Sequence, residues 1–274
     1  MEINNLKIIA NEIRKGIVTA VHAAGAGHPG GSLSSADILA YLYFEEMKNI
    51  DPADPHNPDR DRFVLSKGHA APVLYAALAE KGFFPKEDLL TLRKIDSYLQ
   101  GHPDMNKVPG VDMSTGSLGQ GFSTAVGMAL AGKMDQKDYR VYSLLGDGEI
   151  QEGQIWEACM FAGFRKLDNL VAILDYNGLQ IDGKTSDVCD PNPVDKKFEA
   201  FNFHVIKADA HDFDSLKAAF EEARSTKGMP SAIIAKSTKG KGVSFMENEA
   251  GWHGKAPNDE QYEQAMAELE MRVK

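Results

Sequence analysis

One stretch constrains the fold more than any other, because it has the pattern of a strand, a helix and a second strand. An apolar run at 141–145 leads into a Gly-Asp-Gly triplet at 146–148, and a second apolar run at 170–174 ends shortly before Asn177. Between them, residues 154–164 carry apolar and small side chains at helical spacing. A segment of this length is typical of a parallel crossover unit of about 30 residues. The sequence therefore predicts an α/β fold, with a three-layer, mostly parallel sheet flanked by helices.

The two predicted strand ends carry side chains that suit a divalent cation. Asp147 and Asn177 both follow the carboxyl ends of predicted parallel strands, where open α/β sheets bind ligands. Carboxylate and amide oxygens, with a nearby backbone carbonyl, suit Mg²⁺ or Ca²⁺, and phosphate oxygens can complete the coordination. The glycines beside Asp147 let a phosphate approach the backbone, and the next helix points its amino end at that anion. We therefore expect a metal–phosphate site here.

The totals of the chain exclude several function classes. Its 274 residues suit one large domain, expected to span 1–274, and no linker or repeat divides it. The net charge of −10 argues against nucleic acid or an anionic membrane as partner. No apolar run approaches the roughly 20 residues of a membrane span, and the charged first residues argue against a secretory signal. The two cysteines, Cys159 and Cys189, are typical of a reducing compartment. We therefore expect a cytoplasmic protein.

Four histidines lie in predicted loops beside glycine or proline: His28, His69, His102 and His253. The loop at 25–31 is rich in glycine and ends the first predicted helix, while His69 follows a short predicted strand at 62–65. Any one of these histidines alone would be ordinary surface. As a set they can move protons and hydrogen-bond sugar hydroxyls near neutral pH. The remaining four are assigned no functional role: His22, His56, His204 and His211.

A second glycine-rich segment lies at 114–121, ahead of a predicted helix at 123–131. Glycines before the amino end of a helix are typical of an anion-binding nest. Their order is G-x-x-G-x-G rather than the dinucleotide pattern G-x-G-x-x-G, so we reject a Rossmann site. Further strands are predicted at 203–206 and 231–235, and further helices at 214–224 and 258–273.

These segments resemble the thiamine diphosphate enzymes and, among them, the transketolase family. Residues 146–183 are similar to that family's metal–diphosphate motif, which opens with Gly-Asp-Gly and closes with Asn. The resemblance implies the thiamine diphosphate-binding fold and its diphosphate-binding domain. It also implies transfer of a two-carbon ketol unit from a ketose phosphate to an aldose phosphate, a reaction of the pentose phosphate pathway.

The resemblance assigns roles to individual positions. It implies three metal ligands: Asp147, Asn177 and the backbone carbonyl of Leu179. It implies contacts with the sugar or cofactor for the four loop histidines, His28, His69, His102 and His253. It implies cofactor contacts at His69, Gly116, Ser117, Leu118, Gly146, Asp147, Gly148, Glu149, Asn177 and His253. It places Glu152 and Glu157 at a subunit interface, in a carboxylate network that reaches the active site, although acidic residues also favour the first turn of a helix.

The resemblance covers essentially the whole chain but only the first of the family's three domains. The family's second domain binds the aminopyrimidine ring and carries the glutamate that protonates it. We therefore expect the chain to be the amino-terminal subunit of a split transketolase, paired with a separate carboxy-terminal subunit in a two-plus-two assembly. A positioned acid–base group is typically worth about 10²–10⁴-fold in rate, so the chain alone should be nearly inactive.

Several alternatives remain open. The chain could serve a split transketolase for an unusual sugar, a 2-oxo acid dehydrogenase or a deoxyxylulose phosphate synthase, or it could be a non-catalytic cofactor-binding subunit. Residues 178–185 fit the nucleotide P-loop formula, but a P-loop must open a helix, and prolines follow within 190–193. We interpret 178–193 as a long loop that the cofactor orders as a lid. The Lys-Gly-rich turn at 236–242 is either a solvated loop or a counterpart of a family turn near the cofactor.

Overall fold

The central sheet consists of five parallel strands in the order β1-β2-β3-β7-β6. The computed structural model describes residues 1–272. The strands are β1 (Arg62–Leu65), β2 (Val141–Gly146), β3 (Leu170–Tyr176), β6 (His204–Asp209) and β7 (Ser231–Lys236). The register of β2 and β3 pairs Gly146 with Asp175. Asp147 and Asn177 therefore leave neighbouring strands at the same edge of the sheet, as the sequence predicts.

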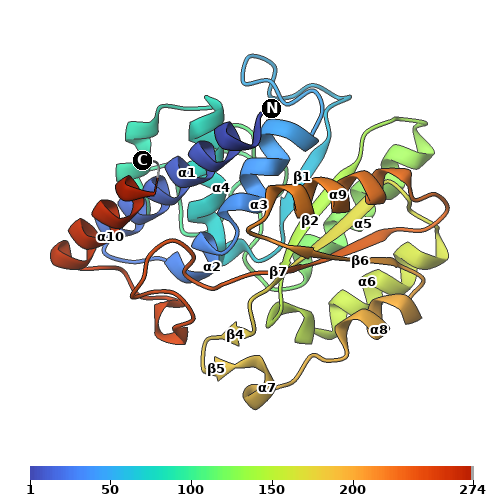
Figure 1. Cartoon of the computed structure of the whole chain (residues 1–274). Coiled ribbons are helices and arrows are strands. Elements are labelled where there is room, and N and C mark those ends of the chain that lie inside the picture. The colour runs from blue at the N-terminus through green and yellow to red at the C-terminus, as the bar shows by residue number, and fades with distance from the viewer. Residues whose placement is uncertain (273–274) are drawn as a thin grey trace.

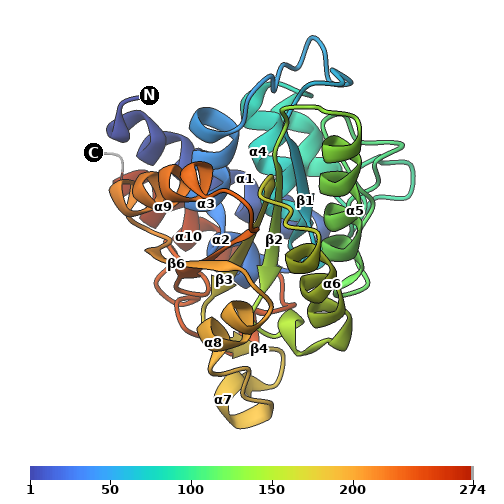
Figure 2. The same ribbon diagram turned by 90° about the vertical axis from the view of Figure 1, so that its right-hand side faces the viewer.

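Helices cover both faces of this sheet and complete the three layers (Figures 1 and 2). On one side of the sheet lie α1 (Ile3–Ala24), α3 (Ala36–Tyr41), α4 (Ala71–Lys81), α9 (Phe213–Ser225) and α10 (Asp259–Met271); α9 packs on β6 and β7, and α10 packs on α1. The other face packs against α5 (Gln120–Met134), α6 (Gly153–Phe164) and α8 (Val194–Ala200). Shorter helical segments are α2 (Pro29–Leu33), the π-helix η1 (Leu42–Glu46), and the 3-10 helices η2 (Gly68–Ala70), η3 (Lys86–Thr91), η4 (Glu149–Gln151) and η5 (Ala250–Trp252).

Two apolar cores form because successive side chains of a strand point to opposite faces. In β3, Val171 and Ile173 belong to the larger core beneath α1 and α9, whereas Ala172 and Leu174 belong to the core beneath α5 and α6. A strand buried on both faces requires a continuous run of apolar residues, as found at 170–174. The predicted three-layer α/β fold is thereby confirmed.

Two predicted loops contain more regular structure than the sequence indicates. In the segment 25–31, residues from Pro29 onward form α2, because proline is tolerated at the first position of a helix. His28 is thus the residue immediately before a short helix. In the segment 178–193, the antiparallel hairpin of β4 (Leu179–Gln180) and β5 (Gly183–Lys184) precedes the short helix α7 (Thr185–Val188). The predicted loop is found at residues 25–28, and the prediction was wrong for the residues of α2, β4, β5 and α7.

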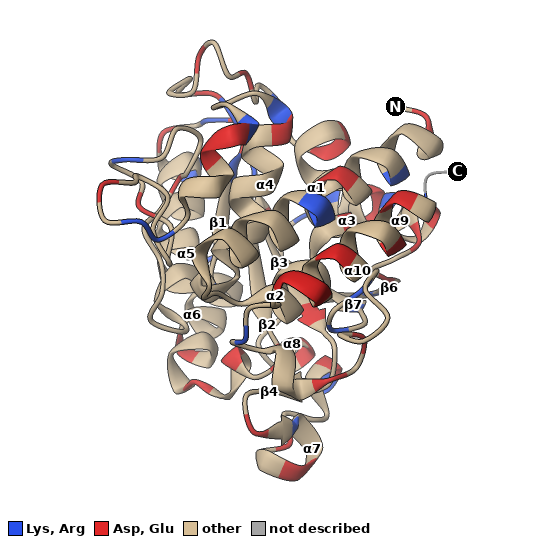
Figure 3. Cartoon of the chain, turned by 90° about the vertical axis from the view of Figure 1, so that its left-hand side faces the viewer, with Lys and Arg blue, Asp and Glu red and all other residues tan. Residues whose placement is uncertain are grey.

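Charged residues of both signs are distributed over the surface elements. Lys and Arg segments lie among Asp and Glu segments in the view of Figure 3, as expected for a chain with 30 basic and 40 acidic residues. Within residues 1–272, no helix is long and apolar enough to cross a membrane. The last helix ends at Met271, and the final residue predicted for it, Val273, lies outside the described residues.

Candidate active site

A cavity of about 370 Å³ lies at the carboxyl ends of β1, β2 and β3, beside the β4–β5 hairpin. Cavities at this edge of a parallel sheet are the usual ligand sites of such folds. The loops after β1, β2, β3 and β7 all contribute to its lining, together with the segment that precedes α2. Most of the predicted site residues lie here: His28, His69, Gly116, Leu118, Gly146, Asp147, Gly148, Glu149, Glu152, Asn177, Leu179 and His253.

The three predicted metal ligands are fixed by backbone contacts at one side of this cavity. Asp147 accepts hydrogen bonds from the backbone N–H of Gly148 at 2.9 Å and of Gly178 at 2.5 Å. The amide oxygen of Asn177 accepts one from the N–H of Leu179 at 3.0 Å. The Leu179 carbonyl accepts one from the Lys239 ammonium at 3.2 Å, so this oxygen already faces a cationic group.

The chemistry of this donor set fits a hard divalent cation. Asp147, Asn177 and the Leu179 carbonyl offer only oxygen ligands, as Mg²⁺ and Ca²⁺ prefer. Among residues 1–272 no cluster of three His, Cys, Asp or Glu residues forms a metal site, so zinc-type coordination finds no counterpart in this part of the chain. The donor set therefore suits a cation that shares its coordination with a phosphate group.

The electrostatics of the cavity favour an added positive charge next to Asp147. Burial, followed by the neighbouring Asp175 carboxylate, raises the pKa of Asp147 to about 6. Burial lowers the pKa of Lys239 to about 8, although Asp147 acts in the opposite direction. A divalent cation would stabilise the ionised form of Asp147, because an opposite charge within a few ångströms favours the charged state.

Three of the four predicted histidines form a compact triangle in the cavity. The ring centres of His28 and His69 lie 5.2 Å apart, those of His28 and His253 5.3 Å, and those of His69 and His253 5.1 Å. These residues come from positions far apart in the sequence, before α2, in η2 and after η5. The fold therefore assembles the histidine set that the sequence only suggests.

The triangle is uncharged near neutral pH. Burial lowers the pKa of His28 to about 4, of His69 to about 2 and of His253 to about 3. A neutral imidazole carries one donor and one acceptor nitrogen, which suits hydrogen bonds to hydroxyl groups. The buried Nδ1 atom of His28 has no hydrogen-bond partner among the described residues, although buried polar atoms usually have one, and a bound ligand could supply it.

His102 and Ser117 lie outside the cavity lining. His102 is exposed, and its ring packs on Gly116, where an added Cβ would lie 3.0 Å from the ring atoms. Gly116 has a φ of 152°, a conformation that side chains rarely adopt. Ser117 is also exposed. The structure thus places Gly116 and Leu118 at the cavity and their neighbour Ser117 at the surface.

Glu149 connects three of the loops that form the cavity. Its carboxylate is 2% exposed and accepts hydrogen bonds from the Ser66 hydroxyl at 2.6 Å, the Gly119 N–H at 3.0 Å and the Gly146 N–H at 3.0 Å. These groups belong to the ends of β1 and β2 and to the residue before α5. The side chain of Glu149 therefore holds these loops together in addition to lining the cavity.

The two glutamates predicted at a subunit interface are both exposed. Glu152 lies immediately before α6 at the edge of the cavity, and Glu157 lies one turn further along this helix. Their carboxylates are accessible to a second chain. Their role at an interface stays a prediction.

The sequence did not identify three buried charged residues that line the same cavity. Lys67, Asp175 and Lys239 are each at most 2% exposed, which is rare for such residues unless they are paired. Of the two interpretations left open for the turn at 236–242, the solvated loop does not hold for Lys239, since its ammonium contacts the Leu179 carbonyl and, at 3.1 Å, His253 Nδ1. The available signal for Lys67 was weak, because a charged residue two positions after an apolar strand is also typical of an exposed loop.

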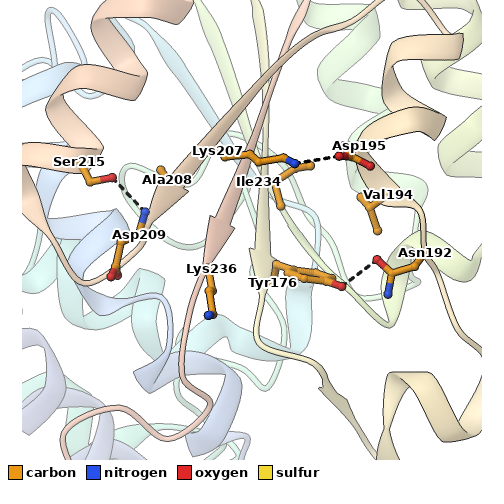
Figure 4. A pocket seen from close by; sticks show the side chains of 10 residues that line it. All are labelled: Tyr176, Asn192, Val194, Asp195, Lys207, Ala208, Asp209, Ser215, Ile234 and Lys236. Atoms are coloured by element: carbon orange, nitrogen blue, oxygen red, sulfur yellow. Dashed lines mark hydrogen bonds and ion pairs between the residues drawn. The ribbon is translucent and has the colours of Figure 1, made fainter.

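A second cavity, of about 440 Å³, lies beside Tyr176 between β6, β7 and the start of α8 (Figure 4). Several of its polar side chains pair with one another. Lys207 pairs with Asp195 at 2.8 Å, and the Tyr176 hydroxyl donates to Asn192 at 2.9 Å. None of the predicted site residues lines it. The cavity at the ends of β1 to β3 is therefore the candidate active site.

Comparison with known proteins agrees with this assignment. Residues 5–273 match the family described as transketolase, thiamine diphosphate binding domain. The chain is 51% identical to the 6-deoxy-6-sulfo-D-fructose transketolase subunit SqwG of Clostridium sp. (strain MSTE9), over 95% of this chain and 94% of that protein. It is 43% identical to an apulose-4-phosphate transketolase subunit of Phocaeicola vulgatus, over 100% of this chain and 96% of that protein.

Longer relatives match over part of their length. Mouse transketolase is 49% identical over 98% of this chain, which spans only 42% of the mouse protein. A crystal structure of transketolase from Campylobacter jejuni superposes with a TM-score of 0.92 at 36% identity, covering 98% of this chain and 43% of that one. The chain therefore belongs to the transketolase family and carries that family's thiamine diphosphate-binding domain.

Proposed function

We propose that the chain is the amino-terminal subunit of a two-subunit transketolase that transfers a two-carbon ketol unit from a ketose phosphate to an aldose phosphate. The observation that carries this proposal is the meeting of Asp147, Asn177 and the Leu179 carbonyl with three neutral histidines around one cavity. Oxygen ligands suit a metal-bound diphosphate, and neutral imidazoles suit sugar hydroxyls.

In this proposal, Asp147, Asn177 and Leu179 hold Mg²⁺, or Ca²⁺ in its place, against the diphosphate of thiamine diphosphate. The backbone around Gly116, Leu118, Gly146 and Gly148 surrounds the diphosphate, and Lys239 adds a positive charge beside it. The bound cofactor would supply the carbanion chemistry that cleaves and forms the carbon–carbon bond.

The histidines are proposed to bind the sugar and to move protons. His28, His69 and His253 present neutral rings to the cavity, and His102 lies outside its lining. A neutral imidazole can accept a proton from one hydroxyl and donate to another without a change of overall charge. The buried, unpartnered Nδ1 of His28 is the strongest structural indication of such a contact.

A separate carboxy-terminal subunit is proposed to complete the site in a two-plus-two assembly. It would bind the pyrimidine ring and provide the glutamate that protonates this ring, while the exposed Glu152 and Glu157 meet it or the second copy of this chain. Support comes from the relatives, since two proteins named as subunits match this chain along almost their whole lengths. We also propose a cytoplasmic location, because the two cysteines of the chain are typical of a reducing compartment.

A second candidate is a transketolase subunit for an unusual sugar. The relative at 51% identity is named for 6-deoxy-6-sulfo-D-fructose and the relative at 43% for apulose-4-phosphate. In either case the chemistry at the cavity is the same, and the partner subunit would select the anionic end of the sugar.

Reconstitution tests the proposal. The chain alone should give negligible ketol transfer, and addition of the carboxy-terminal subunit with thiamine diphosphate and Mg²⁺ should restore it. Assays with fructose 6-phosphate and with 6-deoxy-6-sulfo-D-fructose as donors distinguish the two candidates. Full activity of the isolated chain would refute the split arrangement.

A further inference from the structure

A buried ion pair lies in the wall of the cavity, and none of the functions described above uses it. Lys67 follows β1 and Asp175 lies near the end of β3, and they are 2% and 0% exposed. The Lys67 ammonium lies 2.5 Å from Asp175 Oδ2 and also donates to the Gly31 carbonyl at 2.8 Å and the Ser35 hydroxyl at 2.7 Å. Such a pair is weak evidence for stability, because the cost of removing both charges from water offsets most of their attraction.

The Asp175 carboxylate joins four parts of the fold. Oδ2 accepts from Lys67, from the Ser34 hydroxyl at 2.6 Å and from the Asn177 side-chain amide at 3.3 Å. Oδ1 accepts from the Ser237 hydroxyl, which follows β7. One carboxylate therefore fixes the ends of β1, β3 and β7 to the segment after α2.

The contact with Asn177 determines which way the Asn177 amide faces. An ionised carboxylate only accepts hydrogen bonds, so the amide nitrogen must face Asp175. The amide oxygen then points away from it, where it accepts from the Leu179 N–H at 3.0 Å. The reversed orientation would place the amide oxygen against the carboxylate and the NH₂ group at the proposed cation, which can be coordinated only by oxygen at this position.

We propose that Asp175 is a positioning residue that orients the Asn177 carboxamide toward the divalent cation, and that Lys67 balances its charge. This inference rests on the proposed function, since it concerns the metal ligand of that same site. Because the hydrogen bond already fixes its orientation, the Asn177 carboxamide loses little further rotational freedom when it binds the cation. Partners of metal ligands typically change metal affinity by about 10–100-fold when removed.

A double variant that removes both charges of the pair tests this role, and a single variant that removes only the ammonium is its control. The test variant is Lys67→Met/Asp175→Ala, and its matched control is Lys67→Met, which keeps the carboxylate opposite Asn177. Binding of Mn²⁺ to the full chain in the presence of thiamine diphosphate is measured by electron paramagnetic resonance of the free ion. Circular dichroism establishes that each variant is folded at the temperature used.

The test variant should bind Mn²⁺ about 10–100-fold more weakly than Lys67→Met. The difference should disappear when both variants also carry Asn177→Asp, because a carboxylate has oxygen at both ends and no orientation to lose. This dependence on the residue at 177 distinguishes positioning from a general structural role.

Equal Mn²⁺ affinity of Lys67→Met/Asp175→Ala and Lys67→Met would overturn the inference. A difference that persists undiminished in the Asn177→Asp background would also overturn it, since the effect would then not act through the amide. Failure of the wild-type chain, alone and with its partner subunit, to bind Mn²⁺ with thiamine diphosphate would instead reject the proposed function. The two failures are therefore distinguishable.

Discussion

Replacement of Glu149 by glutamine should lower the free energy of unfolding, because it weakens the hydrogen bonds that hold the loops around the cavity, while the side chain keeps nearly the same size and shape. In the wild type, one carboxylate oxygen accepts from the Ser66 hydroxyl and the Gly119 N–H, and the other accepts from the Gly146 N–H. An amide has only one oxygen. Glu149→Gln can therefore keep the first two hydrogen bonds only by placing its NH₂ group against the N–H of Gly146.

The expected magnitude follows from the group that loses its acceptor. A buried donor left without a partner costs about 1–3 kcal/mol, so we expect a loss near 2 kcal/mol in the free energy of unfolding. For a domain of this size, that loss corresponds to a fall in Tm of about 4–8 °C. Burial raises the pKa of Glu149, while the three hydrogen bonds and the nearby Lys67 favour the ionised form.

Thermal and urea unfolding followed by circular dichroism would measure this effect. Glu152→Gln is the matched control, because Glu152 is exposed three residues away. Surface changes of this kind usually stay within about 0.5 kcal/mol. A Glu149→Gln protein with the Tm of the control would refute the assignment of Glu149 as the link between these loops.

Two further predictions concern packing and pH. Gly163→Ala should destabilise the fold by about 1–3 kcal/mol or more, because an added Cβ would lie 2.0 Å from the Phe201 carbonyl oxygen. The control is Gly153→Ala in the same helix, whose added Cβ meets no atom within 4 Å. In urea unfolding this control should be neutral or slightly stabilising. Equal stability of the two variants would contradict this packing. In the folded protein the pKa of His28 is about 4 and that of His69 about 2, below the ordinary 6.5. The unfolded chain therefore binds protons at these residues more readily than the folded chain does. Their contribution to the free energy of unfolding is present above pH 6.5 and is lost as the pH falls toward the folded-state pKa values. Urea unfolding between pH 7.5 and 4.5 should therefore show a shallower decline for His69→Gln than for the wild type, and an identical decline would exclude a buried neutral His69.

The crossover from β2 to β3 could be predicted from the sequence because its signals are local. The apolar runs at 141–145 and 170–174 and the helical spacing at 154–164 lie within β2, β3 and α6, respectively. The strand ends then place Asp147 and Asn177 side by side through the parallel register alone. Helices and strands with a clear hydrophobic period and a short connection can therefore be predicted from their own residues.

The buried charges could not be predicted, because their partners lie far away along the chain. Lys67 and Asp175 are separated by 108 residues, and each looks like an ordinary polar residue at the end of a strand. Ser34 and Ser35 have the residue type and position of helix caps, yet no side-chain cap is formed and both hydroxyls instead lie near Asp175. Contacts with distant parts of the chain therefore determine which hydrogen bonds these side chains form.

The segment 178–193 shows a second reason why prediction from sequence fails, which is the shortness of its regular elements. The sequence correctly excluded a P-loop helix there, since the helix that follows Lys184 has only four residues. It gave no sign of the β4–β5 hairpin, whose strands have two residues each. Strands this short lack the alternation on which prediction depends.

The central claim is that the ends of β2 and β3 together bind a divalent cation that holds thiamine diphosphate. Calorimetric titration of thiamine diphosphate into the chain reconstituted with its partner subunit, with Mg²⁺ and with a chelator, tests it most directly. The wild type should bind the cofactor only with Mg²⁺, and Asp147→Ala and Asn177→Ala should each lose this Mg²⁺-dependent binding. Undiminished Mg²⁺-dependent binding by both variants would contradict the account.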